Sequence, residues 1–135
     1  MARFNSTRES AQLLPTVPPR VSSSFRARAT RPAAAFACAQ WNGCLVAIAS
    51  QLENDAVATL IPPAGTSWLG LEQAPNAPTP NDGWSWCDGT PLAFSKWLPA
   101  KPDGGELCVF EDAGGLWDDA PCNSTYSAFV CERPL

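Results

Sequence analysis

The six cysteines constrain this chain most, because all of them lie between residues 38 and 131 of 135. None belongs to a Cys-x-x-Cys pair, and the sequence has no histidine that could join them in a zinc site. This pattern favours disulfide bonds formed in an oxidising compartment. Because six cysteines can pair in many ways, their spacing alone leaves the connectivity open.

The charge is divided unevenly along the chain. Residues 1–35 contain six arginines and one glutamate, whereas residues 36–135 carry a net charge of −9. Residues 1–24 are rich in Ser, Pro and Arg and poor in large apolar side chains, so they bury too little surface to offset the entropy of ordering them. We therefore predict a disordered basic tail at residues 1–24 and one folded domain at residues 25–135.

The tail limits the possible partners and locations. Its arginines are not interleaved with aromatic residues, so we expect no nucleic-acid binding. No run approaches the roughly 20 apolar residues of a membrane helix, so we expect no membrane segment in this chain. An Arg- and Ser-rich start without an apolar core leaves an organelle transit peptide as an alternative. The cysteines instead predict an extracellular or secretory location.

Local signals predict two short helices followed by strands. Thr30 and Pro32 begin an alanine-rich helix that stops near Asn42. Ser50 and Glu53 have the spacing of a capping box and begin a second helix. Beyond residue 67, short apolar or aromatic runs alternate with turn-forming clusters, which is typical of strands. The predicted strands are 45–48, 68–71, 84–86, 107–110, 116–117 and 128–131, with an irregular stretch at 88–106.

A series of ordered motifs resembles the C-type lectin-like domain family over residues 30–135, with an opening strand at about 22–28. Trp68-Leu69-Gly70-Leu71 is similar to the W-I-G-L core strand of that family. The other matching positions are Cys38, Asn42, Gly43, the 45–48 strand, residues 84–89, Trp97, residues 101–103, Gly105, Glu106, Cys108, Trp117, Asp118, Asp119, Cys122 and residues 129–132.

The resemblance implies an α+β fold with two short helices, small antiparallel sheets and a long irregular loop region, stapled by disulfides. It pairs Cys38 with Cys131 and Cys108 with Cys122. Cys44 and Cys87 have no counterpart in the common pattern, and we predict that they bond to each other; two free thiols are the alternative. The tryptophans Trp84, Trp86, Trp97 and Trp117 are expected in the core rather than on a sugar-binding surface.

Residues 101–119 concentrate carboxylates, which are the ligands that calcium prefers. In lectins that this chain resembles, a calcium ion is held by residues around a proline, a later glutamate and a pair after a tryptophan, and sugar hydroxyls complete the coordination. The matching metal ligands are Asp103, Glu106, Asp118 and Asp119, and the ligand-binding set adds Lys101 and Pro102. Glu111 and Asp112 fall outside this pattern and are expected to be ordinary surface acids. Gln73 and Leu107 stand where other calcium positions of the family have acids.

Lys101 departs from the pattern, because an ammonium group has no lone pair to ligate a metal. Two arrangements follow. In one, calcium binds through the four acids while Lys101 turns outward. In the other, Lys101 lies among the acids as an internal counter-ion, and the site holds no metal.

The leading hypothesis is a calcium-assisted carbohydrate-binding module whose partners are carbohydrates or glycoproteins, with its oligomeric state left open. The alternative is a calcium-independent lectin-like domain that binds protein or ice and has lost the sugar site, because one fold hosts several functions. We expect no enzyme: a glycoside hydrolase would need two acids with separated pKa values, and adjacent solvent-facing acids lack a means to separate them. Asn5 and Asn123 each begin an N-x-S/T sequon.

Overall fold

The computed structural model describes residues 7–14 and 20–134, with side chains described from residue 20 onward. Helix α1 spans Arg31–Gln40 and α2 spans Gln51–Ala58. The strands are β1 (Thr7–Leu14), β2 (Arg20–Arg26), β3 (Cys44–Leu45), β4 (Thr66–Gln73), β5 (Trp84–Trp86), β6 (Cys108–Asp112), β7 (Trp117–Ala120) and β8 (Ala128–Pro134). Within the described residues, no helix is both long and apolar enough to cross a membrane.

Both helices begin where the sequence predicts. The Thr30 side chain accepts a hydrogen bond from the Ala33 amide, and Ser50 accepts one from the Glu53 amide at 3.1 Å. The capping box of α2 is shifted, because Glu53 Oε1 accepts from the amide of Ala49 at 3.3 Å rather than from that of Ser50. The predicted 45–48 strand is shorter, since only Cys44 and Leu45 pair as β3.

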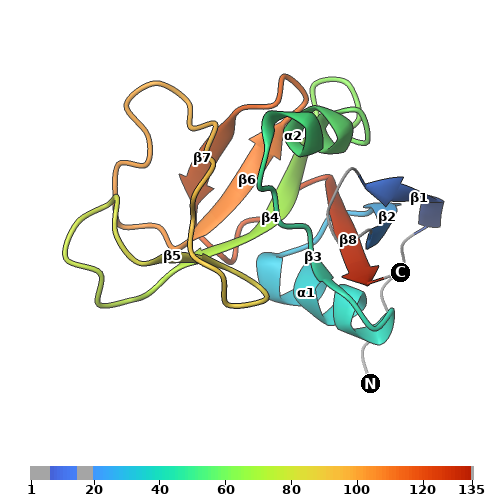
Figure 1. Cartoon of the computed structure of the whole chain (residues 1–135), viewed down its shortest axis with the longest axis horizontal. Coiled ribbons are helices and arrows are strands. Elements are labelled where there is room, and N and C mark those ends of the chain that lie inside the picture. Colours follow the sequence, from blue (N-terminus) through green and yellow to red (C-terminus); the bar gives the residue numbers. More distant parts are fainter. Residues whose placement is uncertain (1–6, 15–19, 135) are drawn as a thin grey trace.

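The strands form one mixed sheet rather than separate small antiparallel sheets (Figure 1). The strand order is β1-β2-β8-β4-β6-β7, with β3 also pairing to β8 and β5 to β4. The β4–β8 pair is parallel, with Ser67 opposite Ala128 and Trp68 opposite Phe129. This short parallel contact joins two groups of antiparallel strands. The small antiparallel sheets that were expected are therefore parts of one mixed sheet.

Hydrophobic side chains fill two clusters on the two faces of the sheet. In β8, Phe129 and Cys131 belong to the cluster that includes α1, whereas Val130 belongs to the cluster that includes Val57 of α2. This division follows from the alternation of side chains along a strand. Trp84, Trp86 and Trp117 are at most 6% exposed, and Trp97 packs against the same cluster as they do, so the predicted core role of the tryptophans is confirmed.

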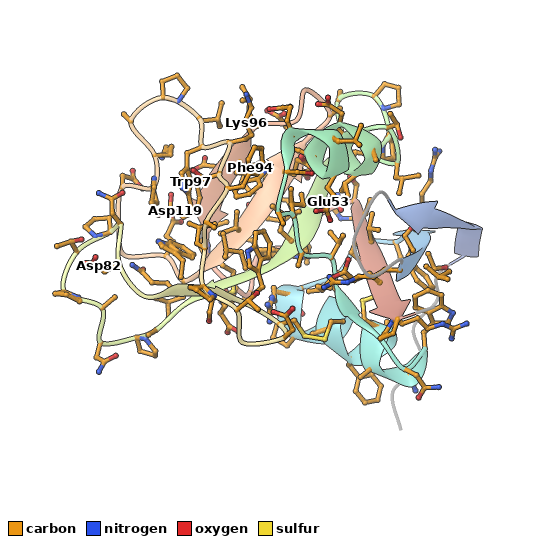
Figure 2. The ribbon with its side chains drawn as sticks, viewed as in Figure 1. Glu53, Asp82, Phe94, Lys96, Trp97 and Asp119 are labelled. Carbon is orange, nitrogen blue, oxygen red and sulfur yellow. A yellow bond between two sulfur atoms is a disulfide. The ribbon has the colours of Figure 1, made fainter. Side chains whose placement is uncertain are left out.

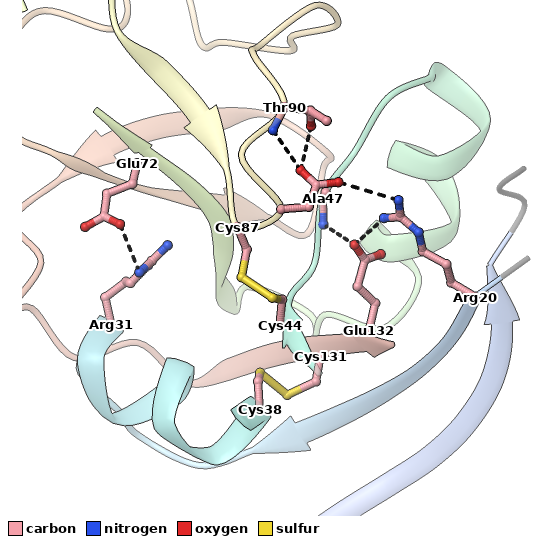
Figure 3. The surroundings of a disulfide bond; sticks show 11 residues. Arg20, Arg31, Cys38, Cys44, Ala47, Glu72, Cys87, Thr90, Cys131 and Glu132 are labelled. Carbon is pink, nitrogen blue, oxygen red and sulfur yellow. Dashed lines mark hydrogen bonds and ion pairs between the residues drawn. A yellow bond between two sulfur atoms is a disulfide. The ribbon is translucent and has the colours of Figure 1, made fainter. Parts of the chain in front are cut away.

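Three disulfides staple the fold: Cys38–Cys131, Cys44–Cys87 and Cys108–Cys122. They are the pairs predicted above, including the pair without a counterpart in the common family pattern. Figure 3 shows Cys44–Cys87 next to Cys38–Cys131, tying β3 to the residue that follows β5. The start of the long irregular region is thereby fixed to the strand beside β8.

Strands occur where the sequence predicts a disordered tail. β1 and most of β2 fall within residues 1–24, and β2 pairs with β8 from Arg20 opposite Pro134 to Phe25 opposite Phe129. Composition does not reveal these strands, because hydrogen bonding to an existing sheet edge does not require large apolar side chains. Phe25 stacks on Phe129 at 5.0 Å, and the small side chains of residues 22–24 are buried. Residues 1–6 and 15–19 of the predicted tail lie outside the described residues.

Arg20 adds an electrostatic contact between this strand and the rest of the fold (Figure 3). Its guanidinium donates a hydrogen bond to Oε1 of the buried Glu132 and lies 3.7 Å from Oδ2 of Asp88. Burial raises the pKa of Glu132 to about 7, although the charge of Arg20 opposes the shift. The described fold therefore begins before the predicted boundary at residue 25.

Candidate site for a cation and carbohydrate

The irregular region at residues 88–106 is held against β7. The Leu98 amide donates to the Trp117 carbonyl, and the Trp117 amide donates to the Lys96 carbonyl, both at 2.8 Å. The Lys101–Pro102 peptide bond is cis, and Pro102 is buried. Figure 2 shows Asp119 of β7 beside the part of this region that carries Phe94, Lys96 and Trp97.

Three of the four predicted metal ligands converge. Carboxylate oxygens of Asp103, Glu106 and Asp119 lie within 4.8 Å of one another. Asp119 is 3% exposed, and its two oxygens accept hydrogen bonds from the amides of Asp103 at 3.5 Å and Gly104 at 3.2 Å. Gly104 has a φ of +92°, a conformation that favours glycine, so the chain can turn back between Asp103 and Glu106. Backbone amides therefore orient Asp119 toward the other two acids.

Lys101 lies beside this group of three carboxylates. Its Nζ is 3.0 Å from Oδ2 of Asp103 and 3.5 Å from Oδ1 of Asp118. Asp118, the fourth predicted ligand, does not belong to the group, and its buried Oδ1 accepts no hydrogen bond from the described residues. Asp103 is thus shared between the ion pair and the carboxylate group.

The ammonium group divides the acids electrostatically. Its hydrogen bond lowers the pKa of Asp103, and the same bond raises the pKa of Lys101. Burial raises the pKa of Glu106, helped by the charges of Asp103 and Asp118. Burial also raises the pKa of Asp119 to about 6, and its contact with Asp118 adds to the shift. Lys101 therefore neutralises one side of the site, while Glu106 and Asp119 retain an unfavourable negative charge that a cation would stabilise.

Gln73 has a role that the sequence does not reveal. This side chain is 7% exposed, and its Nε2 faces the carbonyls of Thr79, Pro80 and Asp82 at 3.1, 3.3 and 2.9 Å. The Trp84 indole donates a further bond to the Pro80 carbonyl at 2.8 Å. An uncharged amide thus lies within hydrogen-bond distance of three backbone carbonyl oxygens of the proline-rich loop at residues 74–83. No sequence motif signals this role, because the acceptors are backbone atoms.

Glu111 is not the surface acid expected from the sequence. It is fully buried, and neither carboxyl oxygen has a hydrogen-bond partner among the described residues. Burial raises its pKa to about 8. The alternation of β6 provides a signal, because Glu111 shares a face with the buried Val109 two residues earlier. Asp112 instead shapes the following turn, where its Oδ1 accepts from the amides of Gly114 and Leu116.

Known proteins with similar sequences share one type of domain with this chain. A family model described as the lectin C-type domain matches residues 28–133. The mouse low affinity immunoglobulin epsilon Fc receptor is 38% identical over 103 residues, which cover 74% of this chain and 30% of the receptor. A type-2 ice-structuring protein of Hemitripterus americanus is 35% identical over 98 residues, covering 70% of this chain and 56% of that protein. The chain thus matches only part of these relatives.

Solved structures extend the similarity to the fold. The cow C-type carbohydrate-recognition domain of CD23, crystallised in the presence of a GlcNAc2Man3 oligosaccharide, has a TM-score of 0.77 at 30% identity, covering 86% of this chain and 88% of that one. A calcium-independent type II antifreeze protein has a TM-score of 0.75 at 25% identity, covering 99% and 95%. These relatives are binding domains rather than enzymes. The matched motifs, the fold and the family model together show that this chain belongs to the C-type lectin domain family.

Proposed function

We propose that this chain is a carbohydrate-binding module in which Asp103, Glu106 and Asp119 hold a calcium ion. The observation that carries the proposal is the convergence of three carboxylates within 4.8 Å. Calcium takes about six to eight oxygen ligands, so backbone carbonyls, water and ligand hydroxyls would supply the others. The donor set fits a hard cation, because it consists of carboxylate oxygens.

The residues of the chain have separate tasks in this proposal. The amides of Asp103 and Gly104 hold Asp119 in place, and the turn at residues 104–105 presents Glu106 to the same point. When bound, the ion supplies positive charge and open coordination positions for sugar hydroxyls. The three disulfides support an extracellular or secretory location, where carbohydrates and glycoproteins would be the partners.

A calcium-independent domain that binds protein or ice is the second candidate, and Lys101 is the observation that favours it. Its ammonium group contacts Asp103 and Asp118, and so supplies from within the chain part of the positive charge that an ion would bring. A relative described as a calcium-independent antifreeze protein shares the fold. In this candidate the acids and Lys101 form a permanent ion-pair network.

Two measurements test the proposal. The first is calorimetric titration of the oxidised chain with calcium, and the second is a glycan array read with and without a chelator. We expect calcium heat and chelator-sensitive glycan binding, both lost in Glu106→Gln and both retained in Asp55→Asn, a matched change on the exposed face of α2. Loss of both signals in Asp55→Asn as well would contradict the assignment to this site.

Other outcomes distinguish the second candidate. Glycan binding that persists without calcium heat would exclude the ion while retaining the carbohydrate. Silence across the array with no calcium heat would overturn the proposal. In that case inhibition of ice recrystallisation tests the ice-binding form of the alternative.

A further inference from the structure

The segment between β7 and β8 carries an Asn-Ser-Thr sequence that the binding site does not use. Asn123, Ser124 and Thr125 follow Cys122, whose disulfide partner Cys108 opens β6. Asn-x-Ser/Thr is the acceptor sequence for N-linked glycans, and it is used where the asparagine lies on the surface of a secreted chain. The structure decides whether this asparagine meets that requirement.

Side chains alternate strictly between exposed and half-buried along this segment. Asn123 and Thr125 are exposed, whereas Cys122, Ser124 and Tyr126 are half-buried. The acceptor asparagine and the hydroxyl residue of the sequon therefore share the outer face, and the middle residue points inward. Among the described residues, no hydrogen bond engages the Asn123 side chain, so its amide is available.

The inner face of the segment is firmly attached to the fold. The Ser124 amide donates to the Pro121 carbonyl at 3.0 Å, and the Arg31 amide of α1 donates to the Cys122 carbonyl at 3.1 Å. Tyr126 forms a bridge with Ala29 and contacts the rings of Trp68 and Phe110. None of these contacts involves the Asn123 side chain, which is exposed. A bulky group on Asn123 would therefore extend into solvent without disturbing packing.

We propose that Asn123 is an N-glycosylation site of this protein. In the secretory pathway, an oligosaccharide passes from a lipid-linked pyrophosphate donor to Nδ2 of Asn123. The sugar–phosphate bond breaks, a carbon–nitrogen bond forms, the amide loses one proton, and the lipid pyrophosphate leaves. The proposal is independent of whether calcium or sugar binds at residues 103–119. The other sequon, at Asn5, lies outside the described residues.

The test is expression of the full chain with an added signal sequence in a eukaryotic cell, followed by intact-mass measurement before and after peptide-N-glycosidase. We expect a mass increase of one glycan that the enzyme removes, leaving aspartate at position 123 in the tryptic peptide. The increase should disappear in Asn123→Gln and Thr125→Ala. It should remain in Thr125→Ser, which keeps the hydroxyl that accepts from Arg28, and in Ser124→Ala, which changes only the middle residue.

The peptide map of the parent chain shows directly whether Asn123 is modified, even if a variant fails to be secreted. Recovery of an unmodified Asn123 peptide from secreted chain with three intact disulfides would overturn the proposal. A glycan lost in Asn5→Gln but kept in Asn123→Gln would overturn it equally. Retention of the Asn123 glycan in Asn5→Gln would support it.

Discussion

Lys101 Nζ lies 3.0 Å from Oδ2 of Asp103, the carboxylate that also belongs to the group formed with Glu106 and Asp119. One side chain therefore takes part in both an ion pair and a prospective cation site. Because the Asp103 carboxylate carries a single negative charge, the Lys101 ammonium group and a bound metal ion would compete for it.

Replacing Lys101 with glutamate should strengthen calcium binding by about tenfold or more. The change removes the competing ammonium and adds a carboxylate next to Asp103 and Asp118. Calorimetric titration measures the effect. Binding by the variant with no heat in the parent would show that the ion pair excludes the metal.

The matched control is Lys96→Glu, which makes the same charge change elsewhere in the irregular region (Figure 2). Its affinity should change much less, because Lys96 forms no ion pair with an acid of the site among the described residues. Equal gains in both variants would mean that net charge, rather than the position of Lys101, governs binding.

Glu111→Gln should make the free energy of unfolding less sensitive to a rise in pH between about 5 and about 8. The pKa of Glu111 rises from 4.5 to about 8 on folding, so the folded chain keeps a proton that the unfolded chain releases between these values. Parental stability from this group is therefore complete below about pH 4.5 and falls as the pH rises toward about 8. Glutamine remains neutral at every pH. The free energy of unfolding of the variant, relative to that of the parent, should therefore rise by roughly 1–3 kcal/mol from about pH 5 to about pH 8.

Thermal unfolding at a series of pH values measures this difference. Glu132 and Asp119 also have raised pKa values, but they contribute equally to parent and variant. Parallel profiles for Glu111→Gln and the parent would show that Glu111 titrates normally.

Replacing both Cys44 and Cys87 with serine should lower the free energy of unfolding by about 4 kcal/mol in the chain-entropy description. These cysteines are 43 residues apart, so their bond restricts a large loop in the unfolded chain. Denaturant unfolding of the oxidised protein provides the measurement, and the double variant avoids a free thiol. An unchanged transition midpoint and slope would show that the bond contributes nothing to stability.

Gln73→Met should loosen the proline-rich loop at residues 74–83. Methionine has a similar length but no donor, so the carbonyls of Thr79, Pro80 and Asp82 lose the Gln73 amide. The expected destabilisation is about 1–3 kcal/mol, with faster hydrogen exchange of the amides in this loop. Gln51→Met is the control, since Gln51 is exposed and its side chain donates a hydrogen bond to Asp55 one helical turn later. Equal exchange rates in the two variants would remove the assigned role of Gln73.

The elements that could be predicted are those whose signals are local. Thr30 and Ser50 mark helix starts because each hydroxyl bonds an amide only three residues away. The buried tryptophans follow from the short aromatic runs of β5 and β7. The resemblance predicts an opening strand at about 22–28, whereas β2 begins earlier, at Arg20, where it pairs with β8 from the other end of the chain.

The sequence by itself determined the family resemblance, the helix starts and the set of acids from which the site is drawn, and the resemblance implied two of the three cysteine pairs. Only the tertiary structure decided which acids meet. Asp103, Glu106 and Asp119 converge, Asp118 faces Lys101, and Glu111 is buried in the core. The reason is physical: local hydrogen bonding depends on residues a few positions apart, whereas burial and charge pairing depend on contacts between a loop, a strand and a helix distant in the chain.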